Sequence, residues 1–137
     1  MDVTPLPARP RVLVIDDSLT MRHMLGAILK SEYEVTLAAS GAEGLALAAS
    51  GAPALILLDV VMPDLDGHEV LRRLKAEAGT ASIPVVFVTG LDGPAGGAPA
   101  GPDGAAGYVA KPLKPEAVRA EVARHLKPRA EPVPLPV

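Results

Sequence analysis

The stretch RVLVIDD at residues 11–17 gives the strongest indication of the fold. Apolar residues follow one another without alternation from Val12 to Ile15, and the acids Asp16 and Asp17 end the run. Such a run is typical of a short strand that is buried on both faces. Both faces are buried when helices cover each side of a parallel sheet, so the stretch predicts an α/β fold with two acids after its first strand.

The remaining sequence alternates between strand-like and helix-like segments. Runs rich in valine, leucine and isoleucine predict further strands at 33–39, 54–59, 83–89 and 107–112. Helical spacing of apolar residues, or a high alanine content, predicts helices at 19–30, 41–51, 64–78 and 115–126. This alternation favours a doubly wound sheet of five parallel strands, with helices on both faces.

Composition limits the classes of protein that the chain can belong to. Its 137 residues suit one domain, and 49% hydrophobic residues are enough for a sizeable core. We expect a flexible arm at 1–10, the folded domain at 11–126 and a Pro-rich, disordered tail at 127–137. The net charge of −3 gives no electrostatic reason to expect nucleic acid or an anionic membrane as a partner.

Two further absences in the sequence restrict the chemistry and the location. The chain has no cysteine, which excludes disulfides, thiolate catalysis and Cys-based metal sites. It has no signal-peptide pattern at its start and no apolar run near the roughly 18 residues that span a bilayer. We therefore expect a cytoplasmic protein without a membrane partner.

Polar residues stand where four of the five predicted strands end. They are Asp16 and Asp17 after the first strand, Asp59 at the third, Thr89 at the fourth and Lys111 at the fifth. Because the carboxyl ends of parallel strands meet at one edge, we expect these side chains to converge. Carboxylates that crowd together repel one another, and all-oxygen ligation of this kind suits Mg²⁺. A carboxylate can also attack phosphorus, with a lysine and a hydroxyl to bind the phosphoryl oxygens.

Each of these residues also has a simpler explanation when it is taken alone. The two acids can be helix caps, Lys111 can be a solvated turn lysine, and Thr89 can satisfy the end of its strand. Only their joint placement at successive strand ends favours a site.

Four motifs carry the polar residues: VIDDS at 14–18, LLDVVMPDLDG at 57–67, PVVFVTG at 84–90 and GYVAKP at 107–112. Thirty residues separate Asp59 from Thr89, and 22 separate Thr89 from Lys111. Together the motifs and spacings resemble the receiver domain of two-component response regulators, above all the single-domain chemotaxis type, across residues 11–126. The resemblance implies a flavodoxin-like fold and a phosphoprotein of phosphorelay signal transduction.

The resemblance implies a role for each acid. Asp59 is the implied phosphoacceptor. Asp17, Asp59 and the main-chain carbonyl of Val61 are the implied direct ligands of Mg²⁺, and Asp16 is implied to act mainly through water.

Three other residues are implied to respond to phosphorylation. Lys111, expected to precede a cis bond to Pro112, pairs with the phosphoryl group, and Thr89 follows that group on activation. Tyr108 is the implied aromatic switch residue that rotates. The alternative for Tyr108 is a half-buried strand aromatic with no switching role.

The stretch GLDGPAGGAPAGPDGAAG at 90–107 departs from the family. Each internal Gly costs a helix about 1 kcal/mol and each Pro about 3 kcal/mol, and Leu91 is the stretch's only large apolar side chain. We expect no stable helix from 93 to 102, so that the fourth helix of the family is missing or disordered. Because that helix normally belongs to the dimerisation or partner surface, we expect a monomer or weak dimer.

The expected function is a phosphorylation-dependent signalling switch. It would take a phosphoryl group from a histidine kinase or phosphotransfer protein and change its binding to an unknown downstream protein. We expect no enzyme activity beyond its own phosphorylation and dephosphorylation. Val61 and Leu91 are apolar at positions where family side chains influence water attack, which predicts slow dephosphorylation. After Leu126 we expect no output domain.

Two other functional classes remain open. A pseudo-receiver would have the fold and act as an interaction module without phosphorylation. The altered segment after Thr89 keeps this alternative open, whereas the complete set of Asp17, Asp59, Thr89 and Lys111 argues against it. A phosphohydrolase would want a general acid near Asp59, commonly two residues on, where Val61 stands.

Overall fold

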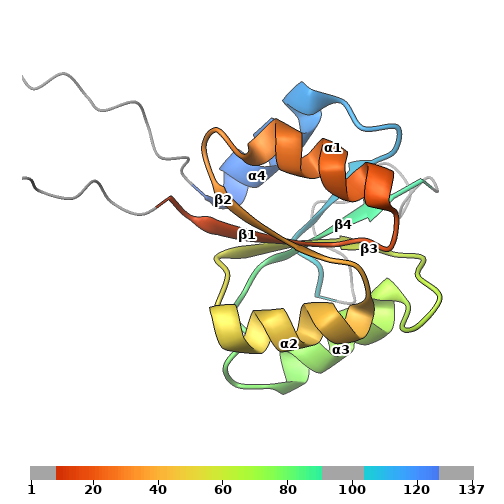
Figure 1. Ribbon diagram of the computed structural model, residues 1–137. Helices are drawn as coiled ribbons and strands as arrows, with labels where there is room; N and C mark the ends of the chain where they lie inside the picture. Colours follow the sequence, from red (N-terminus) through yellow and green to blue (C-terminus); the bar gives the residue numbers. More distant parts are fainter. Residues whose placement is uncertain (1–8, 91–103, 127–137) are drawn as a thin grey trace, which may run out of the picture.

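The computed structural model describes residues 9–90 and 104–126 (Figure 1). Within these ranges five strands form one parallel sheet in the order β2-β1-β3-β4-β5. This is the order of the flavodoxin-like doubly wound fold, in which the chain crosses from one side of the first strand to the other. The predicted fold class is therefore confirmed.

The strands and helices in the described ranges match the predicted segments, with ends shifted by a few residues. The strands are β1 (Arg11–Ile15), β2 (Glu34–Ala38), β3 (Leu55–Asp59), β4 (Val85–Thr89) and β5 (Gly107–Ala110). The helices are α1 (Leu19–Leu29), α2 (Gly41–Gly51), α3 (Gly67–Ala76) and α4 (Pro115–His125). The segment 93–102, expected to lack a helix, lies outside the described residues, as do residues 1–8 of the arm and the tail 127–137.

Helices cover both faces of the sheet. In Figure 1, α1 and α4 lie on one face, and α2 and α3 lie on the other. One apolar cluster joins the first pair of helices to the sheet, for example through Leu25, Leu29 and Val118. A second cluster joins α2 and α3 to it and includes the fully buried Phe87. The three central strands are buried on both faces for this reason, as the apolar runs predicted.

The edge strand β2 is less buried than the three central strands. It has a neighbour on one side only, and its residues Glu34, Thr36 and Leu37 are exposed. An edge strand of this kind tolerates polar residues because one of its sides faces water.

The close approach of α2 to the sheet depends on glycine. A Cβ atom at Gly44 would lie 2.4 Å from the Cδ1 atom of Ile15, which is a core residue of β1. The absence of a side chain at this position lets the helix pack directly on the first strand, next to the end that carries the two acids.

None of the helices in the described part of the chain has the length and apolar character needed to cross a membrane.

Candidate metal and phosphorylation site

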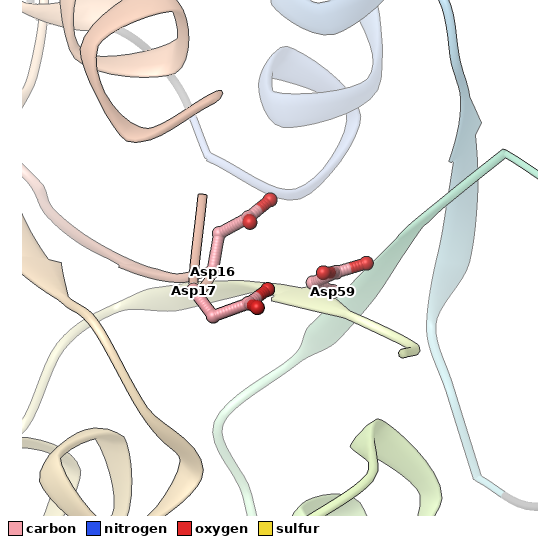
Figure 2. Close-up of side chains that lie close together, drawn as sticks. All are labelled: Asp16, Asp17 and Asp59. Atoms are coloured by element: carbon pink, nitrogen blue, oxygen red, sulfur yellow. The ribbon is translucent and has the colours of Figure 1, made fainter. Parts of the chain in front are cut away.

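Three carboxylates meet at the carboxyl ends of β1 and β3. Asp16, Asp17 and Asp59 each offer one oxygen, and these oxygens all lie within 4.8 Å of one another. Figure 2 shows the three side chains grouped at the end of the sheet. The strand register accounts for the meeting, because Ile15 is paired with Leu58 and the next residue of each strand is an aspartate. The three acids therefore lie close together, as the sequence predicts.

The main-chain N–H and one carboxylate oxygen of Asp16 are hydrogen-bonded, whereas its other carboxylate oxygen is not. Its N–H donates to the carbonyl of Ala38 at 3.0 Å, and its Oδ1 accepts from the N–H of Ser18 at 2.9 Å. The residue is only 1% exposed, and its Oδ2 is buried with no hydrogen-bond partner among the described residues. Burial raises the pKa of the Asp16 carboxyl, and the nearby Asp59 carboxylate adds to that rise.

Lys111 supplies the positive charge of the site. Its Nζ lies 3.3 Å from Oδ1 of Asp59, which is itself 5% exposed. Lys111 follows the last residue of β5, and its N–H donates to the carbonyl of Thr89 at 2.8 Å. The Lys111–Pro112 bond is cis, as expected. Thr89 is buried at the end of β4, next to the strand that carries Asp59.

The loop between β3 and α3 is anchored at both ends. The N–H of Val61 points back to Oδ1 of Asp59 at 3.4 Å, while its side chain is 66% exposed. The N–H of Gly67 donates to the carbonyl of Val60 at 2.7 Å. A Cβ atom at Gly67 would lie 2.5 Å from the carbonyl oxygen of Asp59 and 2.8 Å from Cα of Val60, so only glycine fits here.

Asp64, in the same loop, ties it to a neighbouring helix. Its two carboxylate oxygens accept hydrogen bonds from the N–H groups of Gly41 and Ala42, the first two residues of α2, at 3.1 Å each. These contacts, with the one from Gly41 as the largest, hold the pKa of the Asp64 carboxyl below its ordinary value. A carboxylate at a helix N-terminus satisfies N–H groups that have no partner within the helix.

Tyr108 lies on β5 and is half-buried. Its ring stacks on Phe87 of β4, with ring centroids 5.8 Å apart, and Phe87 also contacts the His68 ring at 5.0 Å. The structure thus places the predicted switch aromatic beside the strand that ends in Thr89. Its rotation remains a prediction.

The donor set fits a hard divalent cation. It offers three carboxylates, one of them with a buried oxygen that has no partner, and these are the ligands that Mg²⁺ takes in proteins. Lys111 neutralises one of the three charges, so the described residues at the site still carry an excess of negative charge. A bound cation would remove that excess, and the cation or a water molecule that it holds would satisfy the free oxygen of Asp16.

The sheet order, the acidic cluster and the lysine that directly follows β5 together define a class of signalling domain. The family described as response regulator receiver domain matches residues 12–123. The chain belongs to this family and is a receiver domain of the two-component type.

Two relatives in sequence illustrate the range of the family. The chain is 38% identical to protein PilH of Pseudomonas aeruginosa over 107 residues, which are 77% of this chain and 88% of PilH. It is 43% identical to the response regulator PleD of Caulobacter vibrioides over 104 residues, or 75% of this chain. The chain spans only 23% of the length of PleD.

Solved structures share the same fold. The chemotaxis response regulator CheY4 of Vibrio cholerae superposes with a TM-score of 0.78 and 30% identity, over 87% of this chain and 100% of that one. The receiver domain of the sensor histidine kinase PA1611 of Pseudomonas aeruginosa has a TM-score of 0.75 and 25% identity, over 86% of this chain and 98% of that one. That domain was solved with a magnesium ion coordinated in its active-site cleft.

Two supports of the site, Asp64 and Arg22, are not predicted by the sequence. The guanidinium of Arg22 donates to the carbonyl oxygen of Asp16 at 2.8 Å, from six positions further along the chain. No sequence pattern predicts the contact of Arg22, because its acceptor is a main-chain carbonyl and every residue has one. Leu91, the other predicted position for control of dephosphorylation, lies outside the described residues.

Proposed function

We propose that the chain is a phosphorylation-dependent switch that takes a phosphoryl group onto Asp59 from a histidine kinase or phosphotransfer protein. The observation that carries the proposal is the surroundings of Asp59, where a lysine ammonium and two further carboxylates lie within 4.8 Å. If Asp59 had only a structural role, the ion pair with Lys111 would be enough to neutralise its charge. The two further carboxylates are explained if all three bind a cation.

The chemistry requires positioning and charge neutralisation more than proton transfer. An oxygen of Asp59 forms a bond to phosphorus as the P–N bond to the donor histidine breaks, and the electron pair of that bond stays on the imidazole. Lys111 can form an ion pair with the phosphoryl oxygens, since its ammonium already lies beside Oδ1 of Asp59. Mg²⁺, when bound by the three acids, supplies positive charge against the phosphoryl oxygens.

The response to phosphorylation is proposed to pass through β4 and β5. Thr89 ends β4 next to Asp59, and Tyr108 lies on the paired strand, against Phe87. A hydroxyl drawn toward new phosphoryl oxygens changes the space available to that tyrosine. We propose that the surface around Tyr108 then changes its affinity for a downstream protein, and that the chain has no catalytic activity on other molecules.

The test is phosphorylation with a small phosphodonor such as acetyl phosphate in the presence of Mg²⁺, read by intact mass. We expect the wild type to gain one phosphoryl group and Asp59→Asn to gain none. Asp66→Asn is the matched control, because it removes a carboxylate at the N-cap of α3, outside the cluster, and asparagine caps a helix as well as aspartate does. Beryllofluoride with Mg²⁺ should shift the NMR signals of Thr89 and Tyr108.

A chain that gains no phosphoryl group and shows no response to beryllofluoride would instead be a pseudo-receiver. With a positive result, a phosphotransfer screen against the histidine kinases of the same organism would identify the donor.

A further inference from the structure

The turn after β1 is fixed at every main-chain group of Asp16. The N–H is bound by Ala38 of β2, the carbonyl is bound by Arg22 of α1, and Oδ1 is bound by the N–H of Ser18. Only Oδ2 is left, and it is the buried atom without a partner. The turn therefore leaves one carboxylate oxygen for a ligand.

Arg22 reaches this turn because of its place on the helix. Ser18 caps α1, with its hydroxyl accepting from Met21, and the N–H of Arg22 donates to the carbonyl of Ser18. Side chains on a helix lean toward its N-terminus, so the arginine extends back over the cap. Its guanidinium can span the distance to Asp16 and stays charged at every ordinary pH.

A firm hold on Asp16 is needed for a physical reason. The residue is buried beside two other carboxylates, and repulsion from them favours rotation of its side chain or unwinding of the turn toward water. The hydrogen bond from Arg22 opposes such a movement because it holds the main-chain carbonyl of Asp16 in place. Among the described residues, the guanidinium of Arg22 donates to a main-chain carbonyl and not to a carboxylate oxygen, so its contribution is to geometry.

We propose that Arg22 is a positioning residue of the metal site, whose guanidinium fixes the turn that presents Oδ2 of Asp16 to Mg²⁺. This inference rests on the proposed function, since it concerns the same site. It assigns a part in metal binding to a side chain that is not itself a ligand. Partners of this indirect kind change metal affinity by about 10–100-fold in other proteins.

The test compares three variants of the full chain with the wild type by calorimetric titration with Mg²⁺ alone. We expect Arg22→Met to weaken Mg²⁺ binding by about tenfold, and Arg22→Lys to fall between that variant and the wild type. Arg124→Met is the matched control. Arg124 pairs with a glutamate near the end of α4, and the end of a helix that follows a parallel strand lies far from the site.

A second measurement needs no metal. Amide hydrogen exchange of the metal-free protein reports on the N–H of Ser18, which is bound to Oδ1 of Asp16. We expect its protection to fall about tenfold in Arg22→Met while core amides of β3 keep theirs. If that variant does not fold, Arg22→Gln takes its place, because glutamine is a good helix former that is too short to reach Asp16.

The outcomes separate this inference from the proposed function. Mg²⁺ affinity in Arg22→Met within about twofold of wild type, with a lowered unfolding temperature, would overturn the inference and leave a merely structural arginine. A wild type whose Mg²⁺ affinity depends on Arg22, but which gains no phosphoryl group, would overturn the proposed function alone.

Discussion

Replacing Asp59 with asparagine is expected to stabilise the metal-free protein, although it alters the centre of the site. Asp59 lies within 4.8 Å of the oxygens of Asp16 and Asp17. At an effective dielectric constant of about 20, each such pair of like charges costs about 3.5 kcal/mol. These repulsions belong mainly to the folded state, because the sequence keeps Asp59 far from the other two acids in an unfolded chain.

The ion pair with Lys111 offsets part of this cost. At 3.3 Å and the same dielectric constant it contributes about 5 kcal/mol of attraction, which the variant also loses. The balance is about 2 kcal/mol in favour of asparagine. Because Asp17 is exposed and its charge is screened by water, we expect a gain of about 1–2 kcal/mol, or about 3–8 °C in unfolding temperature.

The assay is thermal unfolding followed by circular dichroism, in EDTA and then in excess Mg²⁺. In EDTA, Asp59→Asn should unfold at a higher temperature than wild type, and added NaCl should reduce the difference. In Mg²⁺ the wild type should gain more than the variant, since ligand binding stabilises the state that binds it. Asp66→Asn should show neither effect. An Asp59→Asn protein that is less stable than wild type in EDTA would refute the electrostatic reasoning.

Three other changes test separate parts of the structure. Gly67→Ala should cost about 1–3 kcal/mol of stability and weaken Mg²⁺ binding, measured by urea unfolding and titration, because its methyl group would meet the carbonyl of Asp59. Val61→Asn should shorten the lifetime of the phosphorylated protein by providing a polar group for water, whereas Val61→Leu should not, as followed by loss of label. Glu69, whose pKa the hydrogen bond from Arg72 lowers to about 2, stabilises the fold above pH 4.5. The difference in urea midpoint between wild type and Glu69→Gln should therefore shrink as pH falls from 4.5 toward 2.

The sheet and the acidic cluster could be predicted from the sequence because both follow from the order of residues along short segments. An apolar run without alternation indicates a strand with two buried faces, and an acid at its end must lie where the parallel strands end. The strand pattern alone therefore predicts that Asp16, Asp59 and Lys111 lie at one edge of the sheet. Their roles in phosphorylation remain predictions.

The supports of the site could not be predicted in the same way. Arg22 and Asp64 act through main-chain groups, and a main-chain carbonyl or N–H looks the same at every position in a sequence. The exposure of β2 could not be predicted either, because its position at the edge depends on the order of all five strands in the sheet. Such contacts depend on tertiary geometry, which local patterns do not specify.

The hydrogen bonds from α2 to Asp64 make that helix a natural place for an optical reporter. Asp64 belongs to the loop that runs from Asp59 to Gly67, so a displacement of the loop at the site would pull directly on the first turn of α2. Ala42 is exposed in that turn, and the chain has no native cysteine. A single cysteine at this position could carry one dye, whose emission would follow the occupancy of the site without touching it.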